Sequence, residues 1–145
     1  MPLLELVAVL TCTLFAGAAI YINAVEHPAR LSCGTEIAVA QWAPSYKRAT
    51  VMQASLAVTA AVSGLIRGVL GGGPLWIGAA AIILAVVPFT LIVIRPTNNR
   101  LLDPLRDRRS DETRQLLESW GRLHSVRSIL AVIASILFIW AAARG

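Results

Sequence analysis

The chain has few residues that can do chemistry. Of its 145 residues only 14% are charged and 6% are aromatic, and it contains two cysteines and two histidines. It has no His-x-x-x-His or Cys-x-x-Cys pair for zinc and no Gly-x-Ser-x-Gly turn. The glycine run at residues 71–73 lacks the preceding strand and the following lysine of a phosphate-binding loop. These absences exclude the familiar zinc, hydrolase and nucleotide-binding signatures.

What the chain does contain is long hydrophobic sequence. It is 57% hydrophobic with a mean hydropathy of +0.69, which is too apolar for an ordinary soluble domain. Four runs of about 20 residues would each span about 30 Å as helices, the thickness of the hydrocarbon core. They cover residues 3–25, 50–70, 75–94 and 123–143. We therefore predict an all-α protein, an antiparallel four-helix transmembrane bundle that forms one domain over residues 1–145.

The first run is interpreted as a retained helix and not as a signal peptide. It lacks a basic start, carries Glu5, and its apolar sequence continues to Val25, past the usual length of a signal peptide core. Cys12 lies within this helix and Cys33 in the loop after it. Two lone cysteines so placed predict neither a disulfide nor a metal motif.

The basic residues are distributed unevenly about the four spans. Both termini and the second loop share one side, which holds Arg67 and Arg144. The other side holds the remaining eleven: Arg30, Lys47, Arg48, Arg95, Arg100, Arg106, Arg108, Arg109, Arg114, Arg122 and Arg127. By the positive-inside rule the first and third loops are cytoplasmic and both termini face outward. The net charge of +5 thus reflects topology in a plasma membrane, such as the bacterial inner membrane, and we expect the lipid bilayer and no nucleic acid as partner.

A proline predicts the end of the first helix, and aromatic residues mark the loop expected after it. Glu26-His27-Pro28 predicts that the helix ends there, because a residue before proline disfavours the α conformation. We expect a loop over residues 29–47, with a segment along the membrane interface that holds Trp42 and Tyr46 at headgroup depth.

The last helix is the most informative segment. Ser110 is a good N-cap, and helical pattern continues from there to residue 143, so residues 111–122 should extend the helix into the cytoplasm. Trp120, His124 and Arg127 share one face, at positions i, i+4 and i+7, which we expect to point into the bundle.

Several polar residues should meet at the cytoplasmic boundary, where polar side chains are costly and commonly functional. His27 follows the first span, Asn98 follows the third, and His124 begins the fourth. The candidate catalytic residues are His124, His27, Asn98, Trp120 and Arg127. The candidate substrate-binding residues are Asn99, Tyr21 and Asn23.

Each candidate also has a structural explanation. His27 could cap a helix, Trp120 could belong to an interfacial aromatic belt, and Arg127 could extend to the headgroups. Glu26 could be the counterion of Arg127 or a solvated surface acid. A metal site made of His27, His124 and Glu26 stays open, although no spaced ligand motif indicates it.

Three short polar motifs add a family resemblance. They are Glu-His-Pro-Ala-Arg at residues 26–30, Pro-Thr-Asn-Asn at residues 96–99, and Trp-x-x-x-His-x-x-Arg at residues 120–127. With the number, order and spacing of the spans, they resemble the DUF1772 or anthrone oxygenase-like membrane proteins over nearly the whole chain.

The resemblance implies oxidation of a small lipophilic aromatic substrate, anthrone- or quinol-like, by O2 without a dedicated cofactor. Such chemistry needs a base, donors to an enolate oxygen and a dry pocket. His124 or His27 could be the base, and Asn98, Trp120 and Arg127 could be the donors. Two alternatives remain, a non-catalytic accessory or scaffold protein and a metal- or haem-binding redox protein. Assembly into a homo-oligomer is also left open.

Overall fold

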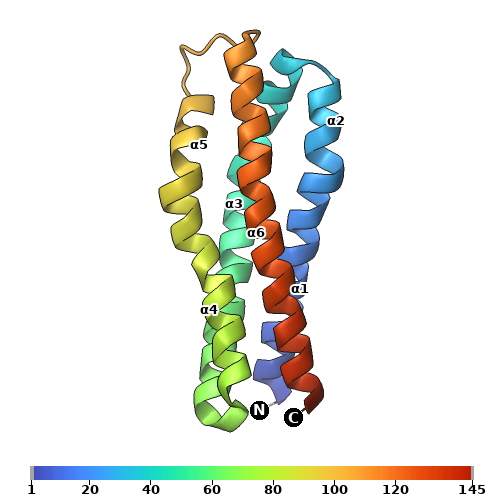
Figure 1. Cartoon of the computed structure of the whole chain (residues 1–145), viewed down its shortest axis with the longest axis vertical. Coiled ribbons are helices and arrows are strands. Elements are labelled where there is room, and N and C mark those ends of the chain that lie inside the picture. Colours follow the sequence, from blue (N-terminus) through green and yellow to red (C-terminus); the bar gives the residue numbers. More distant parts are fainter. Residues whose placement is uncertain (1, 145) are drawn as a thin grey trace.

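Four helical rods make up the structure, a computed structural model that describes residues 2–144 (Figure 1). The first rod consists of α1 (Pro2–Tyr21), the π turn η1 (Ile22–Glu26) and α2 (His27–Ser32). The second consists of α3 (Thr35–Arg67) and η2 (Gly68–Gly72). The third consists of α4 (Pro74–Phe89), η3 (Thr90–Ile94) and α5 (Arg95–Leu101), and the fourth is α6 (Asp111–Arg144). Each rod is long and apolar enough to cross a membrane, which confirms the predicted fold class.

The rods form an antiparallel bundle with both chain termini at one end (Figure 1). Both α1 and α4 pack against α3 and against α6, so α3 and α6 lie across the bundle from each other. Gly71 and Gly73 have φ values of 97° and 87°, which favour glycine and allow the short turn between α3 and α4. We call the end that carries the 102–110 segment and the α2–α3 turn the loop end.

Pro28 does not end the first rod, and this expectation was wrong. The chain stays helical to Ser32 because the π turn η1 precedes the proline. The His27 N–H donates to Ile22 O, five residues earlier, and Pro28 then occupies the first turn of α2. The third rod has the same arrangement before its proline. The π turn η3 precedes Pro96, and the Arg95 N–H donates to Thr90 O, five residues earlier.

The expected loop over residues 29–47 was also wrong. After Gly34 the chain enters α3, which continues through Pro44 as one helix. Pro44 leaves the carbonyl of Ala40 without its helical hydrogen bond. Both residues are exposed, so the helix tolerates the proline there. Trp42 is fully buried in the bundle.

The last helix follows the prediction. It runs without interruption from Asp111 to Arg144, and the Ser110 Oγ accepts a hydrogen bond from the Thr113 N–H at 3.2 Å. The buried face of α6 carries Trp120, His124 and Arg127, as expected from their spacing.

The interior has two parts of different composition. The larger, which we call the alanine core, fills the half of the bundle near the termini with small residues around a few large ones. Its members are Ala8, Cys12, Phe15, Ala16, Ala19, Ala57, Ala60, Ala61, Trp76, Ala79, Ala80, Ile83, Val86, Ala131, Ala134, Phe138 and Ala141. A second cluster lies nearer the loop end and consists of Ile22, Ala38, Val39, Trp42, Ile94, Leu101, Leu116, Leu117 and Trp120.

Candidate active site

His124 is held by Asn23, which lies in the π turn η1. The Asn23 Nδ2 donates to Gly121 O and to Ser125 Oγ, both at 3.0 Å, so its Oδ1 faces His124 Nδ1 at 2.7 Å. Because a carbonyl oxygen only accepts, Nδ1 carries the proton and Nε2 keeps its lone pair. Ser128 Oγ donates to the same Oδ1 at 2.6 Å. Asn23 therefore orients the imidazole, and its substrate-binding role stays a prediction.

His27 packs against α6 at a glycine. Its Nε2 donates to Leu117 O at 2.9 Å, so Nδ1 keeps the lone pair. That Nδ1 is buried and has no hydrogen-bond partner among residues 2–144. A methyl group on Gly121 would lie 2.7 Å from His27 Cδ2, so only glycine allows this approach. The two imidazoles thus have opposite tautomers.

The indole of Trp120 packs against both imidazoles. Its ring centroid is 5.1 Å from that of His27 and 4.9 Å from that of His124. Trp42 meets it edge-on at 5.7 Å, and the guanidinium carbon of Arg30 lies 6.0 Å from its ring. These contacts pack aromatic rings and one guanidinium beside the two histidines.

Glu26 is not the counterion of Arg127, which corrects our earlier interpretation. It forms an ion pair with the buried Arg30 and accepts hydrogen bonds from Ser45 Oγ at 2.6 Å and Gln41 Nε2 at 3.1 Å. These contacts join the first rod to α3. The carboxylate is therefore directed at α3 and away from Arg127.

Arg127 is bound by a neutral side chain that the sequence analysis did not select. Its Nη2 donates to Gln53 Oε1 at 2.8 Å, and its guanidinium carbon lies 5.6 Å from the ring of Phe15. No carboxylate pairs with it among residues 2–144. Gln53 is an amide within the second predicted span, and the cost of polar groups there could have indicated it. Arg30, also buried, was missed because it was assigned to a loop.

Two cavities adjoin these side chains. The smaller, of about 10 Å³, is lined by Arg30, Trp120 and His124 among others, and has room for about one water molecule. The larger, of about 120 Å³, is mostly apolar and lies between α1, α3, α4 and α6. Thr50, Gln53 and Arg127 line both cavities. His124 thus borders a small cavity that shares three lining residues with the larger, mostly apolar one.

The remaining candidates are divided between interior and surface. Asn98 in α5 is buried, and neither its Nδ2 nor its Oδ1 has a hydrogen-bond partner within the described chain. Asn99 is exposed, and Tyr21 is 54% exposed beside a shallow surface hollow. Neither lines the two cavities, so the structure does not bring them to the histidines. The catalytic and binding roles of all these residues stay predictions.

The metal-binding set that we considered is not assembled. Over residues 2–144 no group of three or more His, Cys, Asp or Glu side chains is placed to hold a metal ion. Glu26 is directed to α3, while His27 and His124 pack against Trp120.

Unpartnered buried polar atoms gather at the loop-end half of the bundle. Among the described residues they are His27 Nδ1, Arg30 Nε, Trp42 Nε1, Gln53 Nε2, Asn98 Nδ2 and Oδ1, and Arg127 Nε. A buried polar group without a partner costs roughly 1–3 kcal/mol. Such a concentration is typical of a binding or catalytic site.

Comparison with known proteins agrees with the resemblance seen in the sequence. The sequence model of the family described as anthrone oxygenase matches residues 42–137. The anthrone oxygenase tpcL of Aspergillus fumigatus is 31% identical over 140 residues, which cover 90% of this chain and 87% of that protein. An anthrone oxygenase of Claviceps purpurea is 30% identical over 148 residues, covering 92% and 84%. No solved structure shows a significant match to the chain.

Proposed function

Because the chain belongs to the anthrone oxygenase family, we propose that it oxidises an anthrone-like lipophilic aromatic substrate with O2. In this reaction a ring methylene becomes a ring carbonyl. The methylene loses both hydrogens, one oxygen atom of O2 enters the carbonyl, and the other leaves in water. The substrate's own anion reduces O2 directly in this proposal, so no cofactor takes part.

The observation that carries the proposal is the fixed tautomer of His124. Asn23 holds the proton on Nδ1, which leaves Nε2 as a base on the side of the small cavity. Imidazole is suited to accept a proton near neutral pH. General bases act directly or through one water, and the small cavity has room for about one water. His124 therefore removes the methylene proton in our proposal.

The anion that forms needs donors around its oxygen. Arg127 is the strongest candidate, because its charge is buried without a carboxylate partner, and Trp120, which lines the small cavity, is a further candidate, whereas Asn98 lines neither cavity. One preorganised donor to a developing oxyanion is worth roughly 10²–10³ in rate. His27, whose Nδ1 is also unpartnered, is the alternative base. We propose that this site lies at the cytoplasmic face of the membrane, because eleven of the thirteen basic residues belong to the same end of the four spans.

Oxygen uptake by the detergent-purified protein with an anthrone tests this function. We expect His124→Ala to lower the rate by about 10²–10⁴-fold, the usual contribution of a general base. His27→Ala should have a smaller effect if His27 only packs beside Trp120. Wild-type rates in both variants would overturn the proposal. Equal, large losses with retained folding would instead assign both imidazoles to the reaction.

A further inference from the structure

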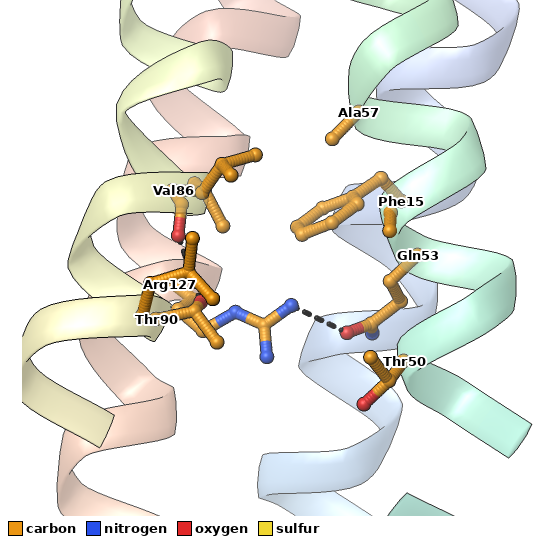
Figure 2. A pocket seen from close by; sticks show the side chains of 10 residues that line it. Phe15, Thr50, Gln53, Ala57, Val86, Thr90 and Arg127 are labelled. Atoms are coloured by element: carbon orange, nitrogen blue, oxygen red, sulfur yellow. Dashed lines mark hydrogen bonds between the residues drawn. The ribbon is translucent and has the colours of Figure 1, made fainter. Parts of the chain in front are cut away.

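The larger cavity has an apolar wall and a polar end. Phe15, Ala57 and Val86 form part of its apolar lining, while Gln53 and Arg127 meet across its polar end (Figure 2). Its lining comes from all four rods. The space thus offers an aromatic surface and a cation to one occupant.

The cavity opens on the side of the bundle between α3 and η3. Its buried lining residues include Gln53 and Val86, whereas Thr50, Ala54 and Leu91 in the same lining are exposed. This opening lies on the flank of the rods and not at either end, because the residues belong to the middle of α3 and to η3. In a membrane-spanning bundle, such a flank borders lipid.

Arg127 makes this cavity selective for a ligand with an anionic or strongly polarised oxygen. Its side chain is 9% exposed, its Nε has no partner in residues 2–144, and its one side-chain acceptor is the neutral Gln53 Oε1. A buried cation without an anion is strongly unfavourable in an apolar surrounding. Gln53 is 1% exposed, and its Nε2 donor also lacks a partner in the described chain. Two buried groups are therefore available to an anionic or strongly polarised oxygen.

We propose that this cavity is the binding site for a lipophilic aromatic oxyanion that enters from the bilayer between α3 and η3, with Arg127 as its counterion and Gln53 as a second positioning residue. The inference rests on the proposed function and specifies where its substrate binds. A cavity of about 150 Å³ accepts one benzene ring, so about 120 Å³ holds one edge of a fused ring system. The rest of the ring system extends through the lateral opening.

This placement also connects substrate and base. The oxygen-bearing edge lies against Arg127 and Gln53, which line the small cavity together with His124. The small cavity has room for about one water, and in this proposal that water relays the proton to His124. Lateral access keeps an apolar substrate out of water until it binds.

Binding of two probes to the detergent-purified full chain tests the inference. The first is 1,8-dihydroxyanthraquinone, which carries ring oxygens, and the second is anthracene, which has none. Tryptophan fluorescence quenching measures both. We expect Gln53→Leu to weaken binding of the first probe about tenfold, because a hydrogen bond to one of its oxygens is lost, and to leave anthracene binding unchanged. Ala54→Phe should weaken both about tenfold or more by filling the opening.

Ala85→Phe is the matched control, since Ala85 is an exposed alanine of α4 outside the cavity lining. It should bind both probes as the wild type does. Wild-type binding by Ala54→Phe, or equal weakening of both probes by Gln53→Leu, would overturn the inference. Ala54 is exposed, so its variant should fold even if Gln53→Leu does not. His124→Ala should lose oxygen uptake but keep probe binding, which separates failure of this site from failure of the proposed reaction.

Discussion

The alanine core and the candidate active site occupy the same bundle but fill it in different ways. The alanine core brings the rods close together with small side chains, and its glycine at Gly64 packs directly against Phe138. Thr13 Oγ1 and Ser135 Oγ form a hydrogen bond there at 2.9 Å. The candidate site holds two histidines and the buried Arg30 and Arg127. Every unpartnered buried side-chain nitrogen or oxygen within residues 2–144 lies in this second region.

The difference separates stability from function. Between helices in lipid, close packing of small residues supplies much of the association energy. The candidate site gives up part of that energy, since unpartnered donors and a buried cation are unfavourable without a ligand. We infer that the alanine core holds the bundle together, that its members Phe15, Ala57 and Val86 also form the apolar wall of the larger cavity, and that the polar groups of the candidate site bind the ligand.

The largest expected effect on stability comes from Phe138→Ala in the alanine core. Phe138 is fully buried, and its ring centroid lies 5.5 Å from that of Trp76. Removing the ring should lower the free energy of unfolding by about 3 kcal/mol, because a cavity remains. Oxygen uptake per folded molecule should not change, since Phe138 is roughly 20 Å along α6 from His124. Thermal unfolding in detergent together with activity checks this, and a matching fall in specific activity would contradict the division of roles.

Arg127→Met should lower activity strongly and change stability little, the reverse of what we expect for Phe138→Ala. Oxygen uptake should fall by roughly 10²–10³-fold, because the main donor to the oxyanion is lost. The unfolding temperature should change little, because relief of the buried charge offsets loss of the hydrogen bond to Gln53 Oε1. A loss of stability as large as that of Phe138→Ala would show that Arg127 mainly supports the fold.

A smaller and more discriminating comparison uses two glycines. A methyl group on Gly64 would lie 2.5 Å from a ring carbon of Phe138, and one on Gly121 would lie 2.7 Å from a ring carbon of His27. Both alanine variants should lose about 1–3 kcal/mol of stability through overpacking. Gly121→Ala should also lower oxygen uptake, since it displaces His27 and disturbs the Asn23 contact with Gly121 O, whereas Gly64→Ala should not. Equal activity in the two folded variants would show that the packing of His27 against Gly121 does not contribute to the reaction.

The residues on the buried face of α6 could be predicted because they depend only on spacing within one helix. The spacing of Trp120, His124 and Arg127 puts them on one side of any α-helix, and Ser110 supplies the start. The partners of that face could not be predicted in this way. Gln53 lies 74 residues from Arg127, and Asn23 lies 101 residues from His124, so their contacts depend on how the rods pack.

The proline positions show a second limit. Pro28 and Pro96 each follow a π turn that keeps the rod helical, whereas local preference indicates a helix end. The turn at Ile22–Glu26 also sets the direction of Asn23, which fixes the tautomer of His124. A helix end at Pro28 would have left the origin of that orientation unexplained.

The four apolar rods, their antiparallel order and the family could be predicted from residue order alone, because length, hydropathy and short motifs are local and need no packing. Which polar groups meet depended on how the rods pack. This packing paired Glu26 with Arg30 and left Arg127 to Gln53, and it placed Tyr21 and Asn99 outside the site. The physical reason is that a polar side chain in an apolar bundle is directed by the nearest donor or acceptor on a neighbouring rod, and rod packing sets those neighbours.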